Sequence, residues 1–283
     1  MEIKTDFLKE LDKFQLIIKK KVTSSYSGPR ASKSYGRGLI FKDHKEYVAG
    51  DDFRTLDWNI YARTENYFIK RYEEERNLTV HIIVDGSASM NFGKNIKKFE
   101  YASMIGLGFA YMALKNNEKF VFSIFSDKLQ PLKPKKGTGH LMEILNFLNN
   151  HKITGKSNIQ DSLLQYKKFI NSRSLVVIIS DMLIDAEELK KILPSFKRHE
   201  LKVIQVLDPI EKELDMTGDL VLHDSETNVF LRTFISRRLR EVYKDRLVVH
   251  SKEVENVCQK LNANFISVTT DTPIFDVFSK VLR

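Results

Sequence analysis

Short apolar runs alternate with longer segments of helical spacing from residue 79 to the end of the chain. A run that is apolar at nearly every position is typical of a central parallel strand with both faces covered. Strands that alternate with helices predict an α/β fold with a doubly wound, mostly parallel sheet and helices on both faces. The predicted strands are 80–84, 120–125, 175–180, 203–207 and 265–268, and the predicted helices are 98–115, 141–148, 159–170, 187–197, 232–261 and 274–281.

Two segments depart from this alternation. Turn residues divide residues 212–230 into short alternating runs, which predicts a hairpin-like insertion. At the start of the chain, apolar residues recur at helical spacing between charged ones, which predicts an amphipathic helix that packs on another surface. We therefore predict three parts: the N-terminal helix at 1–23, a small β-rich subdomain at 24–76, and the α/β domain at 77–283.

The composition is that of a globular protein. Of its 283 residues, 42% are hydrophobic and 11% aromatic, which excludes a disordered chain. Cys258 is the only cysteine, which excludes an intrachain disulfide and a cysteine-based zinc site and favours a reducing compartment. The first residues lack the apolar core of a signal peptide, and no apolar run approaches the ~20 residues of a membrane-spanning helix. We therefore predict a cytoplasmic protein with no transmembrane segment.

An acid and two hydroxyl residues follow directly on the first buried strand. Asp85, Ser87 and Ser89 would lie on a tight loop at the carboxyl end of the sheet, where open α/β folds build their sites. Asp181 follows strand 175–180 in the same way. Hard oxygen donors suit Mg²⁺ or Mn²⁺ rather than zinc. The alternative is a strand-to-helix turn in which Asp85 or Ser89 only caps the next helix.

A charged block around the only tryptophan precedes this strand. Gly50-Asp51-Asp52 is typical of a turn. Arg54, Asp57 and Arg63 lie near Trp58 in the sequence, and they predict an ion-paired network on an aromatic platform. This network either braces the small subdomain or forms an exposed docking surface.

The ordered pair of motifs, the Gly-Asp-Asp and Asp-Trp block followed by Asp-x-Ser-x-Ser-Met, resembles the bacterial domain of unknown function 58 family over residues 28–283. This resemblance implies a von Willebrand factor type A, Rossmann-like fold with a metal-ion-dependent adhesion site. In such a site, Asp85, Ser87 and Ser89 would hold Mg²⁺ (or Mn²⁺), and Asp181 would be the distant aspartate, binding directly or through water. The usual Gly-x-Thr loop matches Gly155-Lys156-Ser157 here, so that Ser157 replaces the threonine.

Family members commonly occur beside MoxR-type AAA+ ATPases, and the resemblance therefore implies such an ATPase as a partner. We expect a non-enzymatic, Mg²⁺-dependent protein-interaction module that serves this ATPase as an adaptor in the maturation or remodelling of protein complexes. A client protein would present an Asp or Glu to an exchangeable position on the metal.

Two alternative functions stay open. A Mg²⁺-dependent phosphohydrolase would use Asp85 as its nucleophile, although Ser87 stands where such enzymes need a second acid for proton transfer. An RNA-associated adaptor would bind through the basic stretch at 30–45, which has interleaved aromatic residues. The net charge of +9 is too small to indicate a nucleic-acid partner by itself, and we expect none.

Overall fold

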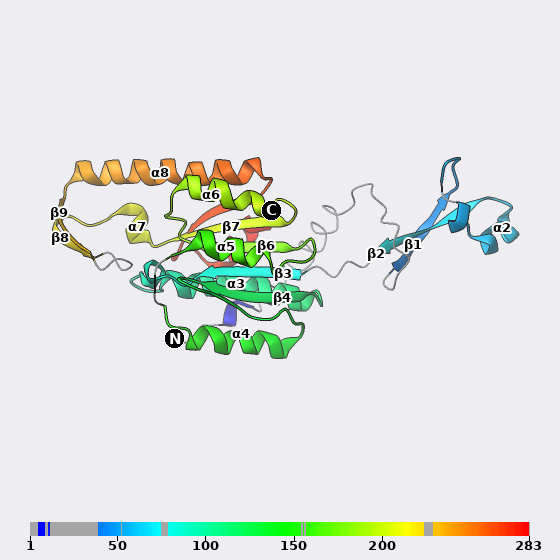
Figure 1. Cartoon of the computed structure of the whole chain (residues 1–283), viewed down its shortest axis with the longest axis horizontal. Helices are drawn as coiled ribbons and strands as arrows, with labels where there is room; N and C mark the ends of the chain where they lie inside the picture. The colour runs from blue at the N-terminus through cyan, green and yellow to red at the C-terminus, as the bar shows by residue number, and fades with distance from the viewer. Residues whose placement is uncertain are drawn as a thin grey trace. The chain divides into compact units, whose positions relative to one another are not determined.

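The computed structural model describes residues 5–8, 11, 39–51, 53–74, 79–153, 155, 157–223 and 229–282. Contacts within the chain divide it into two compact units. The smaller unit lies within Ser27–Asn77, and the larger unit contains the remaining residues (Figure 1). The predicted boundary between residues 76 and 77 falls outside the described residues.

The larger unit is built on one six-stranded sheet with the strand order β10-β7-β6-β3-β4-β5. All pairs of neighbouring strands are parallel except β4 and β5, which are antiparallel. This arrangement confirms the predicted α/β class. The strands are β3 (Thr79–Asp85), β4 (Lys119–Phe125), β5 (Leu129–Pro131), β6 (Leu175–Ser180), β7 (Glu200–Leu207) and β10 (Asn264–Thr269).

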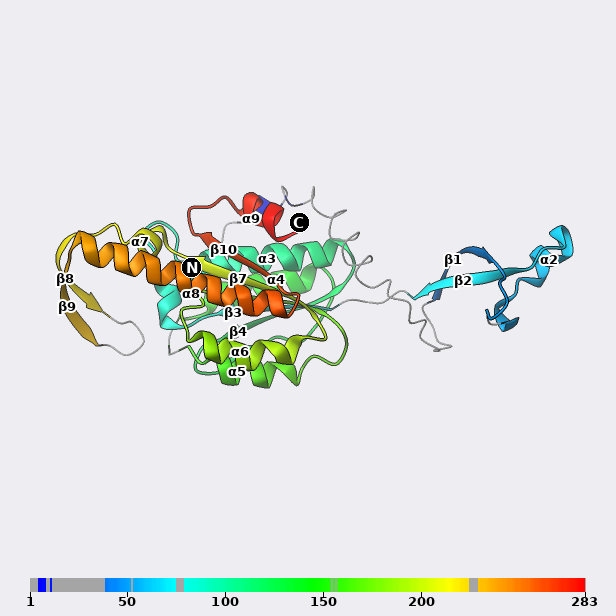
Figure 2. The ribbon, with the colours of Figure 1, turned by 90° about the horizontal axis from the view of Figure 1, so that it is seen from above.

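Helices cover both faces of the sheet because its central strands are apolar on both sides (Figure 2). Ile82 belongs to the hydrophobic cluster under α3, α4 and α9, whereas the next residue, Ile83, belongs to the cluster under α5, α6 and α8. The first group is α3 (Lys98–Lys115), α4 (Thr138–Asn150) and α9 (Ile274–Val281), and the second is α5 (Ile159–Lys167), α6 (Ala186–Ile192) and α8 (Arg237–Lys260).

Most predicted elements are present, and the largest errors are at one end of two predicted helices. The helix predicted at 187–197 ends at Ile192 and is followed by the 3-10 helix η4 (Leu193–Phe196), whose second residue, Pro194, has no backbone N–H. The helix predicted at 232–261 begins only at Arg237, because the side chain of Ser236 accepts a hydrogen bond from the backbone N–H of Leu239 and caps the helix there. Residues 232–235 belong to a strand instead.

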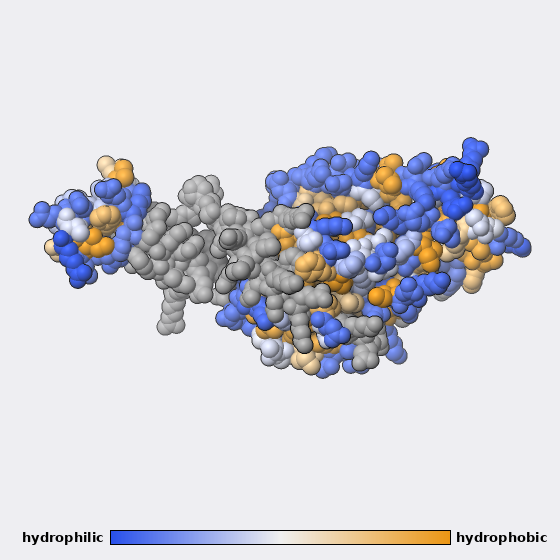
Figure 3. Space-filling model, turned by 180° about the vertical axis from the view of Figure 1, so that it is seen from behind, coloured by the Kyte–Doolittle hydropathy of each residue, from blue (hydrophilic) through white to orange (hydrophobic). Residues whose placement is uncertain are grey.

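The predicted hairpin-like insertion consists of β8 (Gly218–His223) and β9 (Phe230–Ile235), which pair antiparallel. Its side chains are largely apolar and exposed: Val221 is 61% exposed, Phe230 67%, Leu231 60% and Phe234 66%. Figure 3 shows apolar side chains gathered at this end of the larger unit. Since neighbouring residues of a strand point to opposite faces, Phe230 and Leu231 leave both faces of the hairpin apolar.

The smaller unit combines the antiparallel strands β1 (Leu39–Glu46) and β2 (Phe68–Glu74) with the 3-10 helix η2 (Phe53–Thr55) and the helix α2 (Trp58–Thr64). Most of the helix predicted at 1–23 lies outside the described residues. Of that segment, Leu8 and Leu11 are buried in the hydrophobic cluster under α3. Within the described part of the chain, no helix is long and apolar enough to cross a membrane.

Candidate metal site

Three loops meet at the carboxyl edge of the sheet, around the end of β3. Asp85 is the last residue of β3 and is fully buried. The next residue, Gly86, donates its backbone N–H to the carbonyl of Phe125 at the end of β4, at 2.7 Å. Ala88 donates its backbone N–H to the carbonyl of Gly155 at 2.9 Å, which joins the loop after β3 to the loop before α5.

The Asp85 carboxylate accepts hydrogen bonds on both oxygens. Its Oδ1 accepts the backbone N–H of Ser87 at 2.9 Å. Its Oδ2 accepts the hydroxyls of Ser180 at 2.8 Å and Ser157 at 3.2 Å. Ser157 thus uses its proton to hold the carboxylate in place. A hydroxyl oxygen is also a hard donor of the kind that Mg²⁺ binds.

The hydroxyls of Ser87 and Ser89 are hydrogen-bonded to each other, with their oxygens 3.0 Å apart. Mg²⁺ prefers six oxygens at about 2.1 Å in octahedral geometry, so two adjacent ligand oxygens are about 3.0 Å apart. The spacing of the two serines matches this requirement. The donor set is hydroxyl and carboxylate oxygen, which suits a hard divalent cation rather than zinc or copper.

A buried lysine, which the sequence analysis missed, completes the cluster. The side chain of Lys98, from the start of α3, has no exposed surface. Its ammonium group donates to the carboxylate of Asp181 at 3.0 Å and to that of Glu211 at 2.7 Å. With Asp85, the cluster contains three carboxyl groups and one ammonium group, so it carries a formal charge of −2 when all are ionised. A divalent cation would neutralise this charge.

The protonation of Asp85 reflects this excess of negative charge. Burial, and after it the charge of Asp181, raise the pKa of Asp85 to about 7, against the hydrogen bonds from Ser87 and Ser180. Burial opposes the charge of Lys98, but Asp181 and Glu211 together outweigh burial and raise the pKa of the lysine. Lys98 therefore stays protonated, while Asp85 lacks a cation of its own among the described residues.

The glycine that begins the Ser157 loop provides a test of the site. Gly155 has φ +93°, and a Cβ placed there would lie 2.4 Å from Oδ2 of Asp127. We expect Gly155→Ala to cost more than about 1 kcal/mol of unfolding free energy and to weaken Mg²⁺ binding, because the loop must shift. Gly139, in α4, is the control, since nothing lies within 4 Å of a Cβ there. Gly139→Ala should instead stabilise the protein in urea unfolding, and an equal loss in both variants would contradict the argument.

The structure brings most of the predicted site residues together. Asp85 and Ser157 are hydrogen-bonded, Ser87 and Ser89 are in contact, and Asp181 follows the strand next to β3. Three polar neighbours were missed: Ser180, Lys98 and Glu211. Among the described residues, no three His, Cys, Asp or Glu side chains are arranged to hold a metal by themselves. The candidate site depends on serine hydroxyls, which are not among those four residue types. Its metal ligands therefore stay a prediction.

A second group of predicted residues lies in the smaller unit. Asp57 is buried, caps α2 by accepting the backbone N–H of Asn59, and binds His44 at 2.9 Å and Lys70 at 3.4 Å. The side chain of Asp51 binds Lys45 at 2.9 Å in the predicted turn. The basic side chains that bind these two acids thus come from β1 and β2.

The remaining residues of that block have different outcomes. The pairing of Arg54 and Arg63 with Asp57 stays a prediction, and Asp52 lies outside the described residues. The predicted aromatic platform is present: Trp58 is 55% exposed and packs edge-on against Phe53 and Tyr61. This exposed face leaves the docking interpretation of the block open.

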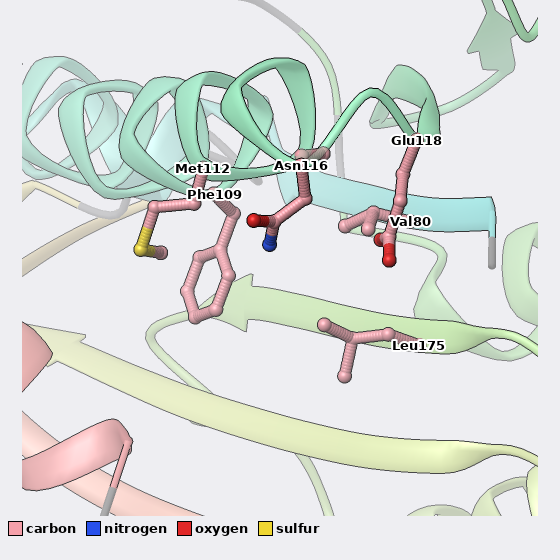
Figure 4. A pocket seen from close by; sticks show the side chains of 7 residues that line it. Val80, Phe109, Met112, Asn116, Glu118 and Leu175 are labelled. Carbon is pink, nitrogen blue, oxygen red and sulfur yellow. The ribbon is translucent and has the colours of Figure 1, made fainter. Parts of the chain in front are cut away.

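At the opposite edge of the sheet, the described residues leave a small void. This void of about 10 Å³ lies between the end of α3 and the first residues of β3 and β6 (Figure 4). Val80, Phe109 and Leu175 line it together with Asn116 and Glu118. A void of this size holds at most one water molecule, so it cannot bind a ligand.

Comparisons with known proteins give a family and no function. The chain matches the family described as "Protein of unknown function DUF58" over residues 43–253, which is more than half of its length. The uncharacterized protein Mb1516 of Mycobacterium bovis is 24% identical over 262 residues, covering 91% of this chain and 83% of that protein. The uncharacterized protein MAV169 of Mycobacterium avium is 33% identical over 99 residues, covering 35% and 59%.

Two solved structures from Bacteroides species are also similar. One is an aerotolerance-related membrane protein from Bacteroides fragilis, with 14% identity and a TM-score of 0.46 over 72% of this chain and 96% of that chain. The other is the conserved hypothetical protein BatB from Bacteroides thetaiotaomicron, with 14% identity and a TM-score of 0.45 over 72% and 97%.

Proposed function

The chain belongs to the DUF58 family of proteins of unknown function, and we propose that its larger unit is a von Willebrand type A domain that binds partner proteins through Mg²⁺ (or Mn²⁺). The observation that carries this proposal is the pair of serine hydroxyls 3.0 Å apart beside a buried carboxylate. The surrounding formal charge of −2 supports it, because a buried charge of this size needs a counter-ion or a proton.

Ser87, Ser89 and Ser157 would hold the metal, with Asp85 and Asp181 binding it directly or through water. When bound, the ion supplies a Lewis acid with an exchangeable position that a partner's Asp or Glu can take. Asp85 is buried and accepts hydrogen bonds on both oxygens, which suits a ligand better than the nucleophile of a phosphohydrolase. The proposal is therefore a non-enzymatic one.

We place this module in the cytoplasm as an adaptor of a MoxR-type AAA+ ATPase that matures or remodels protein complexes. The ATPase partner rests on the family resemblance, whereas the metal site also rests on the residues described above. A client protein would present an acidic residue to the metal.

Thermal unfolding with and without metal tests the site. Binding to the folded state alone should stabilise the protein by about 2.7 kcal/mol at a Mg²⁺ concentration one hundred times the dissociation constant. Ser87→Ala should lose this gain, and without metal it should cost about 1 kcal/mol, because Ser87 is fully buried and its hydroxyl is hydrogen-bonded to that of Ser89. If millimolar Mg²⁺ does not change the melting temperature of the wild type, the metal site is refuted.

Co-purification with a MoxR-type AAA+ ATPase tests the partner. We expect wild-type protein to retain the ATPase in Mg²⁺ and to release it on addition of chelator, and Ser87→Ala to retain none. If binding survives both treatments, the ATPase docks elsewhere and the metal serves only a client.

A further inference from the structure

A second hollow lies at the same edge of the sheet as the candidate metal site. It has a volume of about 470 Å³ and is lined by the loops before α3, after β7 and after β10. This volume is within the range of about 300–1,000 Å³ that is usual for ligand pockets. Open α/β folds bind ligands outside the carboxyl ends of their strands, where this cavity lies.

The lining is mainly apolar. Its apolar residues are Ile96, Tyr101, Met104, Pro209, Ile210, Pro273 and Ile274. The two exposed charged residues, Lys94 and Asp271, have opposite signs. The buried acid, Asp208, already caps the short helix α7 (Pro209–Glu213) and accepts the hydroxyl of Thr270 at 3.3 Å. The cavity therefore suits an uncharged, apolar group rather than an ion.

The cavity and the metal site share one structural element. In α7, Ile210 lines the cavity and the next residue, Glu211, binds the ammonium of Lys98. Lys98 in turn binds Asp181 at the metal site. The metal site lies at the ends of β3 and β6 and the cavity at the ends of β7 and β10. With neighbouring strands about 4.8 Å apart, the two sites are roughly 10 Å apart.

We propose that this cavity takes a large apolar side chain of the same partner segment that binds the metal. An extended segment advances about 3.3 Å per residue and its side chains alternate between two faces, so the apolar residue lies two or four positions from the Asp or Glu on the ion. The partner motif is thus one acid and one apolar residue at either spacing. The inference rests on the proposed metal-dependent binding and adds to it the chemistry of the partner.

Synthetic peptides in a Gly/Ser background test the motif, with binding measured by NMR titration in Mg²⁺. One peptide has an aspartate with leucines two and four positions later, and the matched peptide has serine in place of both leucines. We expect the leucine peptide to bind at least about tenfold more tightly, as is usual for an apolar pocket. Ile210→Ser and Ile96→Ser, on two different walls, should each remove most of this preference. Val248→Ser, 52% exposed on α8, is the control and should leave it unchanged.

Separate titration of each protein with Mg²⁺ alone distinguishes the possible failures. If Mg²⁺ binds and both peptides bind equally, the cavity does not contribute to recognition of the partner. This inference is then refuted, whereas the proposed metal-dependent function is not. If wild-type protein binds no Mg²⁺, both the proposed function and this inference are refuted. Equal Mg²⁺ affinity in wild type and Ile210→Ser would show that this substitution acts on the cavity alone, whereas a lost leucine preference in Val248→Ser would contradict the assignment.

Discussion

Lys98→Met is expected to cost about 3–5 kcal/mol of unfolding free energy, because it leaves buried carboxylates without their cation. The ammonium of Lys98 has no exposed surface and contacts both Asp181 and Glu211. Methionine fills a similar volume, so the loss of stability would come from the missing positive charge rather than from a cavity. Urea unfolding at pH 7 in chelator measures it.

Neutralising the partners provides the control for this prediction. In the triple variant Lys98→Met, Asp181→Asn, Glu211→Gln, no buried charge is left unpaired, and most of the lost stability should return. Replacement of a buried ion pair by neutral groups is often close to neutral for stability. A loss below about 1 kcal/mol in the single variant would mean that water solvates the two carboxylates, and that Lys98 does not fix Asp181.

The fold was largely readable from the sequence because the central strands are apolar at consecutive positions. That pattern is typical of central strands whose two faces are both covered by helices. In the structure, β3 and β6 are the two central strands of the sheet. The short antiparallel strand β5 gave no such signal, since only three residues pair at the sheet edge. The start of α8 was misplaced because the apolar residues of β9 run directly into the helix, and only the cap at Ser236 separates them.

The site could be predicted from the sequence only in part. Polar residues that follow a buried strand are visible in sequence, as Asp85 and Asp181 were. Lys98 and Glu211 come from a helix start and a short helix far along the chain, and only the tertiary structure brings them together. One signal was available: Lys98 occupies the same helical face as Tyr101 and Ile105, which are buried, and a lysine on such a face needs an acidic partner.

The contribution of Asp85 to the unfolding free energy of the metal-free protein should fall as the pH rises from about 4 to about 7. The folded pKa of Asp85 is about 7, against an ordinary value of 3.8. The folded state therefore binds more protons than the unfolded state in this range. The stabilisation of the folded state by protonated Asp85 is fully present below pH 4 and is lost as the pH approaches 7. The expected slope is about 1.4 kcal/mol per pH unit, or about 4 kcal/mol in all.

Asp85→Asn isolates this contribution from that of every other titrating group. The difference in unfolding free energy between wild type and variant, measured in urea from pH 4 to 8, should change with pH in metal-free buffer. Mg²⁺ competes with the proton for Asp85, so its affinity should fall about tenfold for each pH unit below 7. Saturating Mg²⁺ should therefore reverse the loss at pH 7 and above in wild type and have little effect on Asp85→Asn. A difference independent of pH would show that Asp85 is already ionised at pH 4, which would remove the charge argument for the metal.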